Sequence, residues 1–210
     1  MARKGATLIA SPWLVLLAVL AYGVVHSFLA SLWAKGRARS WFGALADRTY
    51  RLLYNIFAVV SFLPVLALVG LLPDQPLYTI PFPWALITSL GQITAVAALL
   101  LGLFQTDVWS FLGFRQLLQP ATGDQPARLV LKGLYRWVRH PLYTAGLVFI
   151  WLTPVMTANI LAMNAGLTVY IVVGALFEER KLLHEFGQVY ADYRKHTPML
   201  VPGLVWKSND

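Results

Sequence analysis

Long apolar runs separated by short polar stretches dominate the chain. Four runs cover about residues 8–32, 52–72, 84–104 and 160–177, and a shorter fifth run covers 142–156. About 20 apolar residues are enough for a helix to cross a bilayer. The pattern therefore predicts an all-α polytopic membrane bundle of about five transmembrane helices.

The last two apolar runs are joined by the short polar turn Thr157-Ala158-Asn159, which predicts a helical hairpin. Beyond Glu178, apolar residues recur at helical spacing as far as Tyr193. An amphipathic C-terminal helix is therefore expected, ending before Pro198, and the topology given below places it in the cytoplasm.

We expect the whole chain, 1–210, to form a single membrane domain. Its first three spans occupy 1–104, a connection occupies 105–141, and the hairpin with the C-terminal segment occupies 142–210. Polar loops are expected at 34–51 and, as an irregular stretch, at 120–125.

The composition supports a membrane protein, because 58% of the residues are hydrophobic and only 12% are charged. The formal net charge of +8 does not indicate nucleic-acid binding, because no basic patch lies on a soluble module. The absence of cysteine excludes disulfides, thiolate metal sites and a cysteine nucleophile.

The basic residues fix a predicted topology. Fifteen of the seventeen Lys and Arg fall in 34–51, in 105–141 and in the C-terminal segment. Positive loops remain in the cytoplasm. With five spans, the C-terminus would lie in the cytoplasm and the N-terminus outside, in a bacterial inner membrane.

The segment Arg139-His140-Pro141-Leu142-Tyr143 stands at the entrance of the fourth span. Proline is favoured in the first turn of a helix, and arginines extend toward the water at the membrane boundary. A capped helix would therefore explain Pro141 and one arginine. It does not explain why His140 and Tyr143 occur three residues apart on one helix face, where neighbouring side chains meet.

Glu178 and Glu179 lie where the fifth span reaches the boundary, and carboxylates there need a partner or water. They could simply mark the water boundary and pair with nearby charges. The hairpin, however, returns them to the depth of His140. This convergence of two segments predicts a site at the cytoplasmic end of the hairpin.

His26 is an ionisable residue inside the first span, and such residues often have functional roles. The alternative is a structural histidine with satisfied hydrogen bonds, for which Ser27 is a candidate partner. No histidine–carboxylate spacing resembles a metal site, so no bound metal is expected.

The ordered segments Gly133–Tyr143, Glu178-Glu179-Arg180 and Phe186–Pro202 resemble the C-terminal signature of the isoprenylcysteine carboxyl methyltransferase and phospholipid methyltransferase superfamily. Further segments, Phe111–Gln116 and Thr153–Thr157, are similar to its methanethiol S-methyltransferase and NnrU-like branch. The resemblance covers about 70 residues in its specific part.

This resemblance implies an S-adenosylmethionine-dependent methyltransferase with its cofactor at the cytoplasmic ends of the last two spans. It further implies catalytic roles for Arg139, His140 and His26. The cofactor-binding set that it implies is His140, Tyr143, Glu178, Glu179, Tyr190, Tyr193 and Pro202.

The methyl acceptor would be a small or lipophilic molecule, with a thiol as the first choice. An isoprenylcysteine carboxylate or a phospholipid is the alternative. Two other classes stay open, a small membrane transporter using a polar path through the bundle and an NADPH-dependent membrane reductase. The absence of internal repeats argues against the transporter, and no G-x-G-x-x-G loop of a soluble methyltransferase is present.

Overall fold

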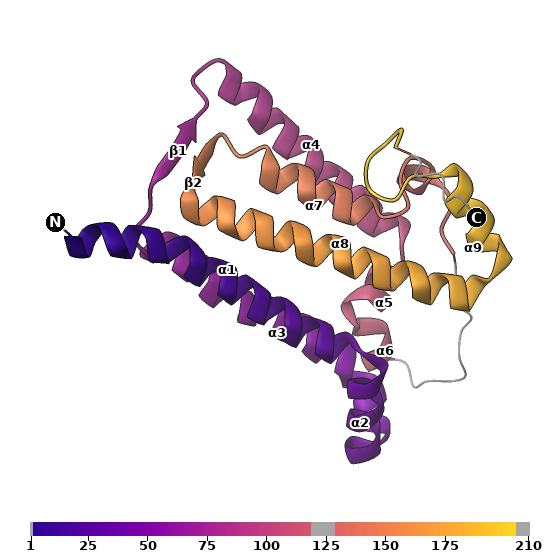
Figure 1. Ribbon diagram of the computed structural model, residues 1–210. Helices are drawn as coiled ribbons and strands as arrows, with labels where there is room; N and C mark the ends of the chain where they lie inside the picture. Colours follow the sequence, from indigo (N-terminus) through magenta and orange to yellow (C-terminus); the bar gives the residue numbers. More distant parts are fainter. Residues whose placement is uncertain (1, 119–128, 205–210) are drawn as a thin grey trace. The chain divides into compact units, whose positions relative to one another are not determined.

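A computed structural model of the chain, which describes residues 2–118 and 129–204, shows long helices and very little strand (Figure 1). Its residues group into two compact units. The first comprises Met1–Leu77, Asp107–Pro126 and Thr157–Leu167, and the second comprises Tyr78–Thr106, Ala127–Met156 and Thr168–Asp210. The irregular loop expected at 120–125 lies outside the described residues.

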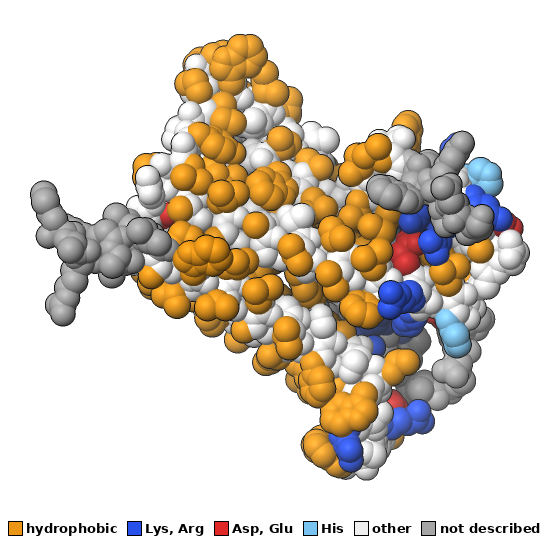
Figure 2. Space-filling view, in the orientation of Figure 1, with side chains coloured by type: hydrophobic (Ala, Val, Ile, Leu, Met, Phe, Trp, Pro, Cys, Tyr) orange, Lys and Arg blue, Asp and Glu red, His pale blue; other side chains and the backbone are white. Residues whose placement is uncertain are grey.

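Four helices of the described residues are long and apolar enough to cross a membrane: α1 (Ala2–Ala30, apolar from Ala10), α3 (Ala44–Leu71), α4 (Trp84–Gln105) and α8 (Ala158–Phe186). The fifth span, expected over 142–156, is the shorter apolar helix α7 (Pro141–Trp151), which ends five residues before the predicted span does. Few residues of these four helices are buried, between 6% and 17% of the apolar stretch of each, and many exposed hydrophobic side chains lie on their visible faces (Figure 2). Because apolar exposed helices suit a lipid environment, the predicted all-α membrane fold is confirmed.

In the first unit, α1 packs against α3, and the helix α2 (Leu32–Phe42) joins them. The sequence 34–51 was expected to be a polar loop, and that expectation is wrong. The Ser31 side chain caps α2 by accepting a hydrogen bond from the Ala34 amide, and Gly43, with φ of 54°, separates α2 from α3. A cap and a single left-handed glycine therefore turn the loop into two helices.

Two short helices, α5 (Val108–Leu112) and α6 (Phe114–Leu118), pack beside α3. The Asn55 side chain donates hydrogen bonds to the carbonyl oxygens of Phe111 and Leu112, both at 3.0 Å. Gly113 joins the two helices at φ of 96°, and a Cβ there would lie 2.5 Å from the Leu52 backbone nitrogen. Only glycine fits this close approach.

In the second unit, α7 packs along α4. Two glycines of α4 make room for this packing, because a Cβ at Gly91 would lie 2.5 Å from Leu152 and one at Gly102 would lie 3.0 Å from Leu142. The Trp151 indole donates a hydrogen bond to the Thr168 hydroxyl at 3.0 Å, which ties α7 to α8. This last contact bears out the expected hairpin of the last two apolar helices. The predicted turn Thr157-Ala158-Asn159 is wrong, because Thr157 belongs to a short strand and Ala158 and Asn159 begin α8.

Between α3 and α4 runs the short strand β1 (Pro76–Thr79), which pairs with β2 (Val155–Thr157) in a two-stranded sheet. The C-terminal amphipathic segment differs in detail from the expectation. The helix α8 continues to Phe186, Gly187 breaks it at φ of 53°, and α9 (Gln188–His196) follows in a new direction.

Candidate functional site

The site candidates of the second unit meet where α7 begins. His140 is the residue before the helix, and Pro141 occupies its first turn, as proline favours. The amides of Arg139 and His140 donate to the carbonyl oxygens of Pro198 and Met199, at 2.9 and 3.2 Å. The C-terminal segment after α9 is therefore fastened by its backbone to the start of α7.

A second tie holds the same segment. The Thr144 hydroxyl donates to the Leu200 carbonyl oxygen at 2.7 Å. Val138 and Leu200 are also buried here. Residues 198–200 thus form one wall of the site, although nothing in their side-chain types indicates this role.

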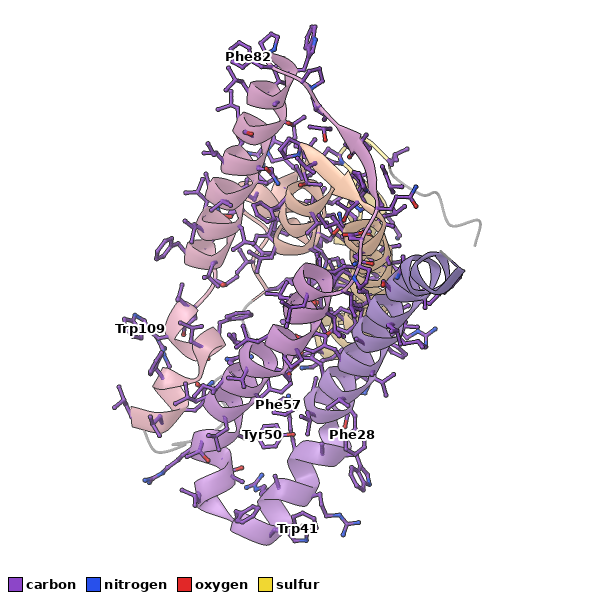
Figure 3. The ribbon with its side chains drawn as sticks, turned by 90° about the vertical axis from the view of Figure 1, so that its left-hand side faces the viewer. Phe28, Trp41, Tyr50, Phe57, Phe82 and Trp109 are labelled. Carbon is purple, nitrogen blue, oxygen red and sulfur yellow. The ribbon has the colours of Figure 1, made fainter. Side chains whose placement is uncertain are left out.

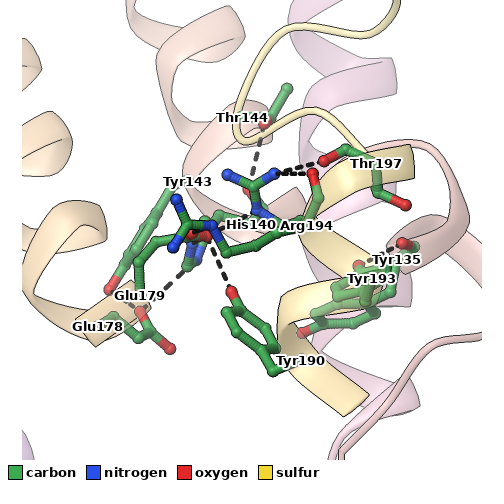
Figure 4. A network of polar contacts seen from close by, with 11 residues as sticks. Tyr135, His140, Tyr143, Thr144, Glu178, Glu179, Tyr190, Tyr193, Arg194 and Thr197 are labelled. Carbon is green, nitrogen blue, oxygen red and sulfur yellow. Dashed lines mark hydrogen bonds and ion pairs between the residues drawn. The ribbon is translucent and has the colours of Figure 1, made fainter. Parts of the chain in front are cut away.

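Glu179 is the centre of the polar network (Figure 4). Its Oε1 accepts hydrogen bonds from Arg139 Nε at 2.7 Å, from the Tyr190 hydroxyl at 2.8 Å and from His140 Nε2 at 2.9 Å. Its Oε2 lies 3.2 Å from Arg194 Nε. The residue is only 5% exposed, so these four partners replace the water that a buried carboxylate would otherwise need.

Arg139 is itself fixed by more than the carboxylate. Its Nη1 donates to the carbonyl oxygens of Arg194 and Thr197. Because one guanidinium joins the start of α7, Glu179 of α8 and the end of α9, the three segments share one buried anchor. Its several fixed donors are typical of an arginine that holds a structure together.

Glu178 differs from its neighbour. Its side chain is 43% exposed, and its Oε2 accepts a hydrogen bond from the Tyr143 hydroxyl at 2.9 Å. His140 Nδ1 lies 3.6 Å from the same oxygen, and the His140 and Tyr143 rings stack with centroids 5.4 Å apart. An accessible carboxylate thus lies beside two aromatic rings, a combination that suits a positively charged ligand.

Three tyrosines complete the network. The buried Tyr190 stands 5.8 Å, between ring centroids, from Tyr193, and the Tyr193 hydroxyl donates to the Tyr135 carbonyl oxygen. Burial, and then the Glu179 carboxylate, raise the pKa of Tyr190 far above its ordinary value. Burial also raises the pKa of Tyr193 to about 12. Both phenols therefore remain neutral donors over the physiological range.

Of the residues expected at the site, the structure joins Arg139, His140, Tyr143, Glu178, Glu179, Tyr190 and Tyr193. Pro202 is exposed in the turn that follows them. His26 belongs to the first unit. Its Nε2 lies 2.7 Å from the Tyr54 hydroxyl, so Tyr54 takes the place proposed for Ser27.

Sequence reasoning missed Arg194 and Thr197, which supply a second cation and a carbonyl acceptor. Arg194 lies four residues after Tyr190, one turn along the same helix face, and this spacing could have indicated it. Among the described residues, no group of three or more His, Asp or Glu could hold a metal ion.

Comparison with known proteins decides the family. The methanethiol S-methyltransferase of Mycobacterium tuberculosis is 34% identical over 197 residues, which cover 90% of this chain and 76% of the relative. The chain belongs to the methanethiol S-methyltransferase family. Methanethiol S-methyltransferase 1 of Bradyrhizobium diazoefficiens is 30% identical over 89% of this chain and 65% of its own length.

A more distant relative is the protein-S-isoprenylcysteine O-methyltransferase of Mus musculus, 35% identical over 42% of this chain and 32% of its own length. No family profile and no solved structure matches the chain. The methanethiol S-methyltransferase relationship and the apolar helices together identify an integral membrane methyltransferase. The predicted superfamily and branch are thereby confirmed.

Proposed function

We propose that the network around Glu178 and Glu179 binds S-adenosylmethionine and supports methyl transfer to a thiol or another lipophilic acceptor. The observation that carries this proposal is the pairing of an accessible carboxylate with aromatic rings and two arginines at one end of α8. The relatives named as methanethiol S-methyltransferases support the same reaction class.

The donor set fits the cofactor, which has a carboxylate, an ammonium group and a sulfonium. The half-exposed Glu178 and the rings of His140 and Tyr143 would meet the positive groups. Arg194, whose side chain is 39% exposed, would meet the carboxylate. When bound, the cofactor supplies a methyl group on a positively charged sulfur.

Glu179 has a different proposed role. Four partners already use its two oxygens, close to the full acceptor capacity of a carboxylate. It would therefore position His140, Arg139 and Arg194 rather than touch the ligand. The two adjacent glutamates are given different roles because their side chains are unequally exposed, Glu178 by 43% and Glu179 by 6%.

His140 is the candidate base that belongs to this network. In its neutral form it donates the Nε2 proton to Glu179, so Nδ1 remains an acceptor on the side of Glu178. A thiol acceptor would lose its proton to Nδ1, and the imidazolium that forms would lie between two carboxylates. Tyr190, Tyr193 and Pro202 would enclose the rest of the cofactor. A catalytic role for His26, which belongs to the first unit, stays a prediction.

The proposed acceptor is methanethiol or a larger apolar thiol, after the names of the relatives. Partial similarity to an isoprenylcysteine O-methyltransferase keeps a carboxylate acceptor as the second choice. The proposed topology places the network on the cytoplasmic side of a bacterial inner membrane, because the basic loops gather there.

The test is methyl transfer from labelled S-adenosylmethionine, using the purified protein in detergent and in lipid nanodiscs. The acceptors are methanethiol, longer alkanethiols, a prenylcysteine and a phospholipid. We expect labelled thioether as the main product. If no acceptor is methylated and NADPH displaces the bound S-adenosylmethionine, the proposal is contradicted and a reductase is favoured.

A further inference from the structure

A cavity of about 390 Å³ lies in the first unit and has no part in the network described above. Its walls come chiefly from Ala38 and Phe42 of α2 and from Leu45, Thr49, Leu53 and Phe57 of α3. Figure 3 shows Tyr50 and Phe57 extending from α3 beside α1 and α2. The walls are almost entirely apolar.

The cavity is long and open. Its α3 lining runs from Leu45 to Phe57, a rise of about 18 Å at 1.5 Å per residue. Three lining residues, Phe42, Leu45 and Leu53, are about 60% exposed. Because α3 is a candidate membrane span, the part of the groove that lies along α3 would face the hydrocarbon of the bilayer.

Water cannot fill such a space favourably. A water occupies roughly 30 Å³ and needs two to four polar partners. The hydroxyls in the wall are already engaged: Thr49 donates to the Leu45 carbonyl oxygen, Tyr50 donates to that of Leu29, and Tyr54 contacts His26. A hydrocarbon chain is the occupant that this lining favours.

Basic side chains cluster beside the cavity. Residues 31–51 carry Lys35, Arg37, Arg39, Arg48 and Arg51 against a single acid, Asp47, which pairs with Arg39 at 3.4 Å. The Arg37 guanidinium lies 5.3 and 5.9 Å from the rings of Trp33 and Trp41. Exposed tryptophans mark the membrane–water boundary, so these cations are placed at the depth of lipid headgroups.

We propose that this part of the molecule is a binding site for an anionic phospholipid. One acyl chain lies in the groove along α3, and the phosphate meets the basic residues of α2 and the start of α3. A zwitterionic lipid would fill the groove equally well but would lack the charge complementarity. The proposal stands independently of the methyl-transfer reaction.

The first test measures which lipid the protein retains. Protein reconstituted in nanodiscs of equal phosphatidylglycerol and phosphatidylcholine is extracted in mild detergent and analysed by native mass spectrometry. We expect one retained phosphatidylglycerol per chain. No retained lipid, or equal retention of phosphatidylcholine, would overturn the proposal.

Two matched substitutions locate the site. Ala38→Phe fills the cavity from α2, and we expect it to lower retention by about tenfold. Ala67→Phe adds the same ring to an exposed position of α3 away from the cavity and should leave retention unchanged. Equal retention in both variants would place the lipid elsewhere and overturn the assignment.

A measurement on the unaltered protein does not depend on whether a variant folds. A phosphatidylglycerol with a photoreactive acyl chain should label residues 38–57 in preference to other exposed apolar segments.

A second pair of variants tests the charge. Arg48→Gln should reduce the preference for phosphatidylglycerol over phosphatidylcholine, whereas Arg180→Gln, in α8, should not. Uniform labelling of all exposed helices, or an unchanged preference in Arg48→Gln, would contradict the proposed site.

Discussion

The two units hold their polar side chains in opposite ways. In the second unit, the buried Glu179 carboxylate has four side-chain partners, and two of them are arginines. In the first unit, the intramembrane His26 contacts the Tyr54 hydroxyl at 2.7 Å and stacks on Tyr22 with centroids 5.5 Å apart. The former is a network of charges, and the latter joins groups that can both be neutral.

This difference has an energetic meaning. A buried charge without its counter-charge keeps the full cost of losing its water, whereas a neutral hydrogen bond contributes about 0.5–1.5 kcal/mol net. Substitutions should therefore be severe around Glu179 and mild around His26. The contrast also separates their proposed tasks, because a charged centre suits a zwitterionic cofactor and an apolar surround suits a lipophilic molecule.

Replacing the central carboxylate should have the largest effect. Glu179→Gln keeps the shape but leaves the buried Arg139 without its anion, so we expect a loss of about 3–5 kcal/mol in the free energy of unfolding. Thermal unfolding in detergent measures it. Glu185→Gln, at an exposed position of the same helix, is the control, and equal melting temperatures for the two variants would refute the central role of Glu179.

The second largest effect is expected at Tyr190. Tyr190→Phe keeps the buried ring and removes the hydroxyl that donates to Glu179 at 2.8 Å. Hydrogen bonds to charged groups contribute about 1.5–3 kcal/mol, and the variant should lose that amount in chemical or thermal unfolding. A loss no greater than that of Val189→Ala, at an exposed neighbouring position, would show that the contact contributes little.

Alkaline pH should weaken the same region. Burial raises the pKa of Tyr193 from 10.0 to about 12, so folding favours the neutral phenol. Below pH 10 the phenol is neutral in both states and the stabilisation is complete. As the pH rises from 10 to 12, the unfolded chain loses the proton first and the stabilisation is lost.

A Tyr193→Phe comparison isolates this effect. The variant should be less stable than the wild type at neutral pH, because the hydroxyl that donates to the Tyr135 carbonyl oxygen is gone. Its deficit should shrink above pH 10. Unfolding is measured in both proteins over this pH range. A stability deficit that stays constant with pH would count against a buried neutral phenol.

The smallest effect is expected in the first unit. Tyr54→Phe removes the hydroxyl that contacts His26 and should cost about 0.5–1.5 kcal/mol. Cofactor affinity, measured by calorimetry, should not change, because neither residue belongs to the network that we assign to the cofactor. If Tyr54→Phe lost as much cofactor affinity as a Glu178 variant, the proposed difference between the two units would be contradicted.

The apolar runs predicted the membrane helices because a bilayer imposes both their length and their composition. The meeting of His140 with Glu178 and Glu179 followed from the short turn between two apolar runs. These predictions rest on local rules that leave a direct trace in the sequence.

Other features leave no such trace. The backbone pairing of Arg139 and His140 with residues 198–199 uses amides and carbonyls that every residue has. The helix α2 is short and polar, so it lacks the periodicity that indicates a helix, and only its Ser31 cap and Gly43 mark its ends. The unequal exposure of Glu178 and Glu179 depends on α9, whose direction follows from the break at Gly187.

The most direct test of the account is a calorimetric titration of S-adenosylmethionine into the wild type, Glu178→Gln and Glu185→Gln. We predict saturable binding to the wild type and the Glu185 variant. Glu178→Gln should bind about tenfold more weakly while its melting temperature stays unchanged, because this side chain is half-exposed. No binding by the wild type, or full affinity in Glu178→Gln, would contradict the assignment of the cofactor to this network.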